Sequence, residues 1–249
     1  MTRRTACVGL LVALLLPGWA AAAGLNDTGI TQCANGSQNG QSCPQTGFPR
    51  QDAETGRDAQ NTAGTLQKAG GGSAGFDFTK LDSNGDPLDA SAASWDCVRD
   101  NVTGLIWEVK TDDAGLRDKD WTYTWYNTDS NTNGGNAGST GGATCGGSLA
   151  NCNTQAYVAA VNALDPALCG YSDWRMPSRE ELRSIVDYSK LSPAIDTHYF
   201  PETVATWYWS ASPYAPDSDG AWVVYFYSGY GYAYYKGYVN AVRLVRGGQ

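Results

Sequence analysis

Two spacings of hydrophobic residues divide this chain into strand-like and helix-like parts. Residues 76–81, 95–99 and 105–109 are short apolar runs typical of strands, and the glycine-containing turn between the last two predicts a β-hairpin. Residues 154–164 and 178–188 instead carry apolar side chains three and four positions apart. This second spacing predicts two helices that each bury one face.

Capping residues support both predicted helices. Asn153 precedes the first helix and is a favourable N-cap residue. Ser178 is followed three positions later by Glu181, which is the capping-box pattern, and the second helix is predicted to end near Tyr188. The predicted inner faces consist of Tyr157, Ala160, Val161 and Leu164 in the first helix and Leu182, Ile185 and Val186 in the second.

The remaining segments complete a fold prediction. From Trp207 onward, aromatic and β-branched residues separated by Gly, Ser, Pro and Asp favour strands and hairpins. The order of hairpin, two helices and C-terminal strands indicates an α+β fold with a mixed or antiparallel sheet, in one domain over residues 76–249. Residues 24–75 are predicted to form an irregular N-terminal extension, and residues 131–142 a mobile surface loop, because both are polar and lack a sustained period.

Residues 1–23 have the pattern of a signal peptide. Arg3 and Arg4 precede an apolar run at 8–16, and alanines at 21–23 supply the small residues of a cleavage site. The run is shorter than the roughly 20 apolar residues that span a membrane. The mature chain is therefore predicted to be soluble and secreted, periplasmic or on the cell surface. General secretion is favoured over twin-arginine export, because the residues that usually follow the arginine pair are absent.

Six cysteines remain after residue 23, and an even number in an exported chain indicates disulfides. Thiolate metal binding is the weaker alternative, because the sequence has no Cys-x-x-Cys pair and His198 is its only histidine. Many pairings are open. Local spacing and loop composition favour Cys33 with Cys43, Cys145 with Cys152, and Cys97 with Cys169.

The chain is acidic, which bears on its partners. It has 17 basic and 25 acidic residues, and loss of Arg3 and Arg4 leaves 15 against 25, a net charge of −10. Nucleic-acid binding needs a basic patch, so no nucleic-acid partner is expected. Adhesion to anionic membranes and insertion into membranes are not expected either.

Four motifs occur in an order that resembles a known family. They are Val102-Thr-Gly-Leu-Ile-Trp107, Asp173-Trp-Arg-Met-Pro-Ser-Arg-Glu-Glu-Leu182, Trp207-Tyr-Trp-Ser-Ala-Ser212 and Val242-Arg-Leu-Val-Arg246. Together they resemble the Lcl C-terminal domain family of secreted bacterial proteins, over roughly residues 76–249. The resemblance implies a C-type-lectin-like fold, which is similar to that of formylglycine-generating enzymes, and binding of carbohydrate or another surface polymer. The oxidases among such proteins need cysteines late in the domain, and this chain has none after Cys169.

The tyrosine-rich C-terminal segment is the candidate ligand-binding surface. Alternation assigns Trp222, Val224 and Phe226 to the core and Val223, Tyr225 and Tyr227 to the opposite, solvent-facing side. A glycine-punctuated run of tyrosines follows. Tyrosine offers a rigid apolar surface with a hydroxyl at its tip, which suits recognition of glycans and proteins. The expected site residues are Tyr225, Tyr227, Tyr230, Tyr232, Tyr234, Tyr235, Tyr238 and Asn240.

Other interpretations of this segment stay open. Tyrosine favours sheets, so the tyrosines could simply pack against the long N-terminal loops of a structural or assembly module of the cell envelope. Trp207 and Trp209 share one strand face and are interpreted as core. Resemblance to retroelement-diversified proteins adds a hypothesis, because Tyr, Asn, Ser, Asp, Gly and Ala can all arise from asparagine codons altered at adenines.

Catalysis has weaker support. His198 lies in a predicted loop, and the sequence has no Gly-x-Ser-x-Gly nucleophile motif to accompany it. Glu180 and Glu181 stand in the first turn of the second predicted helix, where acidic residues are common, so their occurrence needs no catalytic role. No catalytic residue is therefore expected, and a secreted polysaccharide hydrolase is the least favoured function. Arg243 and Arg246 are expected to pair with carboxylates in a structural role.

No cofactor is expected, although one segment is similar to a calcium loop. Asp82, Asn84 and Asp86 have the alternation of such a loop. However, Gly85 precedes the third ligand instead of following it, and Ala93 stands where a closing glutamate is needed. Calcium is therefore a minor alternative, and no metal ligands are assigned.

Overall fold

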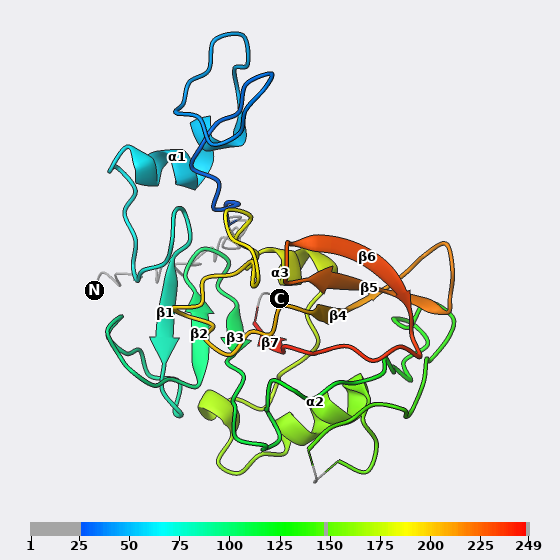
Figure 1. Ribbon diagram of the computed structural model, residues 1–249. Helices are drawn as coiled ribbons and strands as arrows, with labels where there is room; N and C mark the ends of the chain where they lie inside the picture. The colour runs from blue at the N-terminus through cyan, green and yellow to red at the C-terminus, as the bar shows by residue number, and fades with distance from the viewer. Residues whose placement is uncertain (1–25, 147–148, 248–249) are drawn as a thin grey trace, which may run out of the picture.

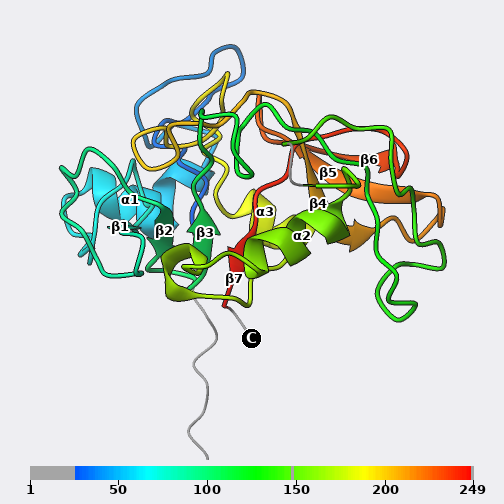
Figure 2. The same cartoon turned by 90° about the horizontal axis from the view of Figure 1, so that it is seen from below.

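The computed structural model describes residues 26–146 and 149–247, so the predicted signal peptide lies outside the described residues. Two antiparallel sheets lie side by side in Figure 1 and Figure 2, with strand orders β1-β2-β3-β7 and β4-β5-β6. The strands are β1 (Phe78–Leu81), β2 (Cys97–Asp100), β3 (Ile106–Glu108), β4 (Trp207–Pro213), β5 (Gly220–Tyr225), β6 (Tyr230–Tyr235) and β7 (Val245–Arg246). The prediction of an α+β fold is confirmed, with the strands divided between two sheets.

The predicted hairpin is formed by β2 and β3, which pair Cys97 with Glu108. Asp100 ends β2 and accepts hydrogen bonds from the backbone of Val102 and the hydroxyl of Thr103, so its carboxylate fixes the turn. The C-terminal strand β7 closes the sheet on the other side of β3. The first and last parts of the domain therefore meet in one sheet.

Both predicted helices are present with their caps. In α2 (Thr154–Asn162), the side chain of Asn153 accepts a hydrogen bond from the Ala156 amide. Ser178 and Glu181 form the predicted capping box of α3 (Arg179–Arg183). The prediction that this helix extends to near Tyr188 is wrong, because the Tyr188 amide donates to the carbonyl of Thr28 in the N-terminal extension.

The segment between α2 and α3 joins the C-terminus to the helices. The Arg175 guanidinium donates to both carboxylate oxygens of Glu181, at 2.8 and 2.7 Å, and to the Gly247 carbonyl at 2.8 Å. Arg246 pairs with Asp173 in the same two-pronged way. The predicted carboxylate pairing is thus confirmed for Arg246.

Arg243 is also structural, but its predicted carboxylate pairing is wrong. The side chain is fully buried, and its guanidinium donates to the Glu108 backbone carbonyl at 2.7 Å and to the Thr203 hydroxyl at 2.8 Å. The Glu108 carboxylate instead accepts hydrogen bonds from the Lys110 ammonium, the Tyr157 hydroxyl and the Leu244 amide.

The N-terminal extension is more ordered than predicted. It contains a short 3-10 helix (Asp52–Glu54) and helix α1 (Gly56–Thr62), neither of which has an apolar stripe. Instead, α1 buries the carboxylate of Asp58, which accepts hydrogen bonds from the amides of Gly29 and Gly75. Burial raises the pKa of Asp58. Because α1 is held by a buried polar side chain, the sequence has no hydrophobic period there from which the helix could be predicted.

Two hydrophobic clusters form the core, and they contact opposite faces of the sheet that contains β5. Val224 and Phe226 belong to one cluster, whereas Val223 belongs to the other together with Trp209. The prediction that Val223 faces solvent is therefore wrong, because Trp209 and its neighbours cover that face. Trp222, predicted as core, remains partly exposed.

Three disulfides confirm the favoured pairing: Cys33–Cys43, Cys97–Cys169 and Cys145–Cys152. Disulfides persist in oxidising compartments, so these bonds are consistent with a protein outside the cytoplasm. None of the helices in the described part of the chain has the length and apolar character needed to cross a bilayer.

Candidate ligand-binding surface

The β5–β6 hairpin gathers four of the C-terminal tyrosines, Tyr225, Tyr230, Tyr232 and Tyr234, on one face of its sheet, and Tyr235 points to the other face at the end of β6. Tyr230 and Tyr232 of β6 pair with Tyr225 and Val223 of β5, and Tyr234 follows two residues later. Side chains two residues apart along a strand share a face, so Tyr230, Tyr232 and Tyr234 lie on the same side. Strand β6 is the outer strand of the sheet (Figure 1), which leaves this tyrosine-bearing strand at the periphery.

Ring contacts join the tyrosines to Trp207 of β4. The Trp207 and Tyr225 rings stack with centroids 4.3 Å apart and an angle of 16° between their planes, and Tyr225 stacks in turn on Tyr227 at 5.6 Å. On the other side, Trp207 lies 4.9 Å from Tyr234, which meets Tyr238 edge-on. The tyrosine surface is defined here as Trp207, Tyr225, Tyr227, Tyr230, Tyr232, Tyr234, Tyr235 and Tyr238.

Most of the tyrosine surface is accessible to solvent. The exposed fractions are 45% for Tyr227, 71% for Tyr230, 58% for Tyr232, 57% for Tyr235 and 57% for Tyr238. Tyr225 and Tyr234 are half-buried beneath them. Burial raises the pKa of Tyr234, and the nearby Tyr232, Tyr225 and Tyr238 raise it further. Its hydroxyl therefore stays neutral at physiological pH and can both donate and accept a hydrogen bond.

Sequence reasoning missed Trp207 as a member of this surface. Trp209 is fully buried, as predicted, but Trp207 is only partly buried and forms the centre of the ring contacts. Alternation places both tryptophans on one face and cannot show where the core that covers the face ends. The register does show it, because Trp207 lies opposite Tyr225 and Trp209 opposite the buried Val223.

Asn240 is predicted from the sequence to belong to the binding surface, but the structure buries it. Only 6% of the residue is accessible, and its backbone exchanges hydrogen bonds with that of Tyr123. This bridge pulls the chain inward after Tyr238, because the neighbouring Ala241 also bonds to β4. Asn240 is thus placed beneath the tyrosine surface instead of within it.

A buried lysine fixes the end of β6. The Lys236 ammonium donates to the carbonyls of Asn133, Asn136 and Ser218 at 2.7–2.8 Å, and it lies 4.3 Å from the centre of the Trp125 ring. The loop predicted over residues 131–142 is present and is attached to the sheet by these contacts. Burial lowers the pKa of Lys236.

An open cleft borders the tyrosine surface at Tyr230. Its volume is about 400 Å³, and its lining includes Arg179, Arg183, Tyr188 and Trp222. Arg179 stacks over the Trp222 ring at 4.3 Å, and the Arg183 guanidinium donates to the Tyr188 hydroxyl. Both arginines lie beside a segment without charge, since residues 220–235 contain no ionisable acid or base other than tyrosine, and the charge of Arg179 is balanced by Glu180.

The residues considered for catalysis are His198, Glu180 and Glu181. His198 is exposed, and its ring lies edge-on to Tyr199. Glu181 is held by Arg175 and by the backbone of Ser178. Glu180 pairs with Arg179 at the surface. Each carboxylate has a structural partner.

The loop considered for calcium closes through its own hydrogen bonds. One carboxylate oxygen of Asp82 accepts from the amides of Asn84 and Asp86, both at 2.9 Å. Carboxylates converge elsewhere among the described residues, within 4.8 Å of one another, in the groups Asp27, Asp52, Asp58 and Asp112, Asp118, Asp120. Backbone amides or ammonium groups already bind members of both groups, for example Asp58, Asp118 and Asp112.

Comparison with known proteins identifies the family. No curated protein matches the chain. The model of the Lcl C-terminal domain matches residues 96–246, a span that runs from β2 to β7 and includes the whole tyrosine surface. Because this match covers more than half of the chain, the protein belongs to the Lcl C-terminal domain family.

Proposed function

We propose that this protein is an exported recognition module that binds a surface glycan or a surface protein through the tyrosine surface. The observation that carries the proposal is the cluster of five exposed tyrosines on and beside the outer strand β6, four of which are joined to Trp207 through ring contacts. Contiguous exposed aromatic surface on a folded domain is typical of interaction sites. The location, secreted or on the cell surface, is part of the proposal.

Rigidity supports binding over a purely structural role. The tyrosines stand on a paired hairpin, and Lys236 attaches its far end to two loops. Side chains that are already ordered lose little conformational entropy when a ligand binds. Tyrosine rings also present flat faces to sugar rings, and their hydroxyls can hydrogen-bond to polar groups of either ligand class.

The rival function is an assembly module of the cell envelope. An exposed aromatic edge could equally mediate contact between copies of this chain or with another envelope protein. Diversification of the tyrosine positions by a retroelement stays a hypothesis, and absence of a reverse transcriptase gene and a template repeat near the gene would remove it.

The decisive experiment compares the mature chain with a variant that carries Tyr230→Ala, Tyr232→Ala and Tyr235→Ala, on an array of glycans and surface proteins. All three side chains are more than half exposed, so their loss is expected to change the free energy of unfolding by less than about 1 kcal/mol. Binding is expected to weaken at least tenfold, which is the loss typical when central aromatic contacts are truncated.

Matched controls separate specific binding from nonspecific adhesion through exposed apolar side chains. Phe48→Ala and Leu191→Ala remove exposed apolar side chains outside the tyrosine surface and are expected to leave binding unchanged. Equal binding by the wild type and the triple variant would refute the proposal. Loss of self-association in the triple variant, measured by sedimentation, with no ligand bound by the wild type would favour the assembly function instead.

A further inference from the structure

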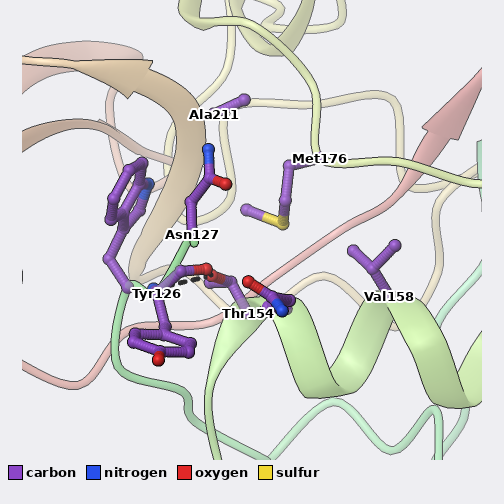
Figure 3. Close-up of a pocket in the computed structure, with 8 residues that line it drawn as sticks. Tyr126, Asn127, Thr154, Val158, Met176 and Ala211 are labelled. Carbon is purple, nitrogen blue, oxygen red and sulfur yellow. Dashed lines mark hydrogen bonds between the residues drawn. The ribbon is translucent and has the colours of Figure 1, made fainter. Parts of the chain in front are cut away.

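A small cavity lies apart from the tyrosine surface, between the start of α2 and the strand β4. Figure 3 shows side chains from separate segments around it, with Met176 and Val158 on one side and Asn127 and Ala211 on others. Its volume is about 180 Å³. An apolar protein cavity of about 150 Å³ is known to hold benzene, so this space is sufficient for one six-membered ring with a small substituent.

The cavity walls are mostly apolar and carry no charge. Trp125, Val158, Met176 and Ala211 supply carbon and sulfur surface, and the complete lining also includes Tyr126, Asn127, Thr154 and Gln155. Thioether sulfur packs favourably against the edges of aromatic rings. A charged ligand would lose hydration here without gaining a partner of opposite charge.

Most polar groups around the cavity already have partners. The Thr154 hydroxyl donates to the Tyr126 carbonyl and accepts from the Tyr126 amide, both at 2.9 Å. The Gln155 amide oxygen accepts from the backbone and hydroxyl of Thr128, and the Asn127 amide nitrogen donates to Thr132. Gln155 is exposed, and its amide nitrogen has no acceptor within the described part of the chain, so it is free to donate to a ligand or to water.

This polar inventory distinguishes an aryl group from a sugar. A hexose carries several hydroxyls, and each that is buried without a partner costs binding energy. An aryl ring needs none, and a single acceptor on its substituent can use the Gln155 amide nitrogen. The walls are also fixed in advance, because the Trp125 indole donates to the Ser210 carbonyl at 2.9 Å and the Ala211 amide to the Pro177 carbonyl.

We propose that this cavity is a binding site for a neutral, single-ring aryl group with one hydrogen-bond acceptor, carried by a small molecule. The site is independent of the tyrosine surface, since none of its lining residues belongs to that surface. Few atoms make contact, so the affinity for an isolated probe is expected in the millimolar range.

The test is a titration of the mature chain with benzyl alcohol, followed by NMR of methyl groups, with methyl glucoside as the sugar probe. Ring currents are expected to shift the Met176, Val158 and Ala211 methyl signals in a saturable way with benzyl alcohol and not with methyl glucoside. Ala211→Leu fills the cavity and is expected to weaken binding at least tenfold. Ala159→Leu adds the same group at an exposed position of α2 and is the matched control.

Three outcomes would overturn the proposal. They are the absence of saturable shifts in the wild type up to the solubility of benzyl alcohol, equal affinity in Ala211→Leu and the wild type, and tighter binding of methyl glucoside than of benzyl alcohol as judged from the Met176 and Val158 methyl signals. If Ala211→Leu does not fold, Val158→Phe fills the same space from α2 and serves in its place. Loss of benzyl alcohol binding in the filled variant, with binding retained in Ala159→Leu, supports the site.

Discussion

At the scale of single residues, Lys236 explains how an uncharged, tyrosine-rich strand is held in position. Only 1% of the residue is accessible, and its ammonium group is bound by three backbone carbonyls and the Trp125 ring. A buried charge is tolerated only when its hydrogen bonds are satisfied, so the three carbonyls and the ammonium depend on one another. The two loops that supply the carbonyls are distant in sequence, and no sequence pattern predicts that they come together.

Lys236→Met is expected to destabilise the protein by roughly 2–4 kcal/mol, because it leaves three carbonyls without their donor. Urea unfolding of variant and wild type measures this difference, with an unchanged m-value as evidence that both unfold in the same way. Lys119→Met is the matched control, since Lys119 pairs with Asp112 at the surface and should change stability much less. A similar loss in both variants would contradict the role assigned to Lys236.

At the scale of elements, local patterns predict helix starts well and helix ends poorly. The capping residues Asn153 and Ser178 act on amides three residues away, so the sequence contains all that is needed. The end of α3 depends on the contact between Tyr188 and Thr28, which are far apart in the chain. The same limit applies to α1, whose buried Asp58 finds its partners only after folding.

The start of α3 predicts a pH dependence of stability. Burial alone would raise the pKa of Glu181, but hydrogen bonds from Arg175 and Ser178 lower it below the usual 4.5. A carboxyl group with a lowered pKa stabilises the folded state above its unfolded value and loses that contribution as the pH falls through the folded value. Glu181→Gln should therefore be less stable than the wild type at neutral pH, and the difference should shrink as the pH falls below about 4.5.

Unfolding in urea between about pH 3 and pH 7 measures this difference. Glu180→Gln is the matched control, because it makes the same chemical change at the neighbouring residue, whose carboxylate is exposed and pairs with Arg179. A difference between Glu181→Gln and the wild type that stays constant with pH would show that the carboxylate charge of Glu181 contributes nothing.

At the scale of the whole molecule, the sequence predicts the fold class and the three disulfides. It does not predict that one hydrophobic cluster covers each face of the sheet that contains β5. Alternation in β5 is real, yet Val223 and Val224 are both buried because a hydrophobic cluster covers each face. Seven of the eight predicted site residues lie on the tyrosine surface, and five of those are exposed. Trp207 and Asn240 were misplaced for one reason: their exposure is set by strand neighbours that are distant in sequence.

The disulfides allow a final prediction, about which bond matters most to stability. Cys97 and Cys169 are 72 residues apart and both fully buried, so their bond closes a large loop that includes α2. In the chain-entropy model such a loop contributes about 4 kcal/mol, compared with about 2.5 kcal/mol for the seven-residue separation of Cys145 and Cys152. The double variant Cys97→Ala, Cys169→Ala should therefore lose more stability than Cys145→Ala, Cys152→Ala.

Both double variants remove one bond and two sulfur atoms, so the comparison isolates loop length and burial. Loss of the Cys97–Cys169 bond also leaves small voids between β2 and the segment that leads to α3, which adds to the entropic loss. Urea midpoints and m-values under non-reducing conditions give the two free energies of unfolding. Equal losses would mean that the unfolded chain is already compact around residues 97–169, because only residual structure there could cancel the advantage of the longer loop.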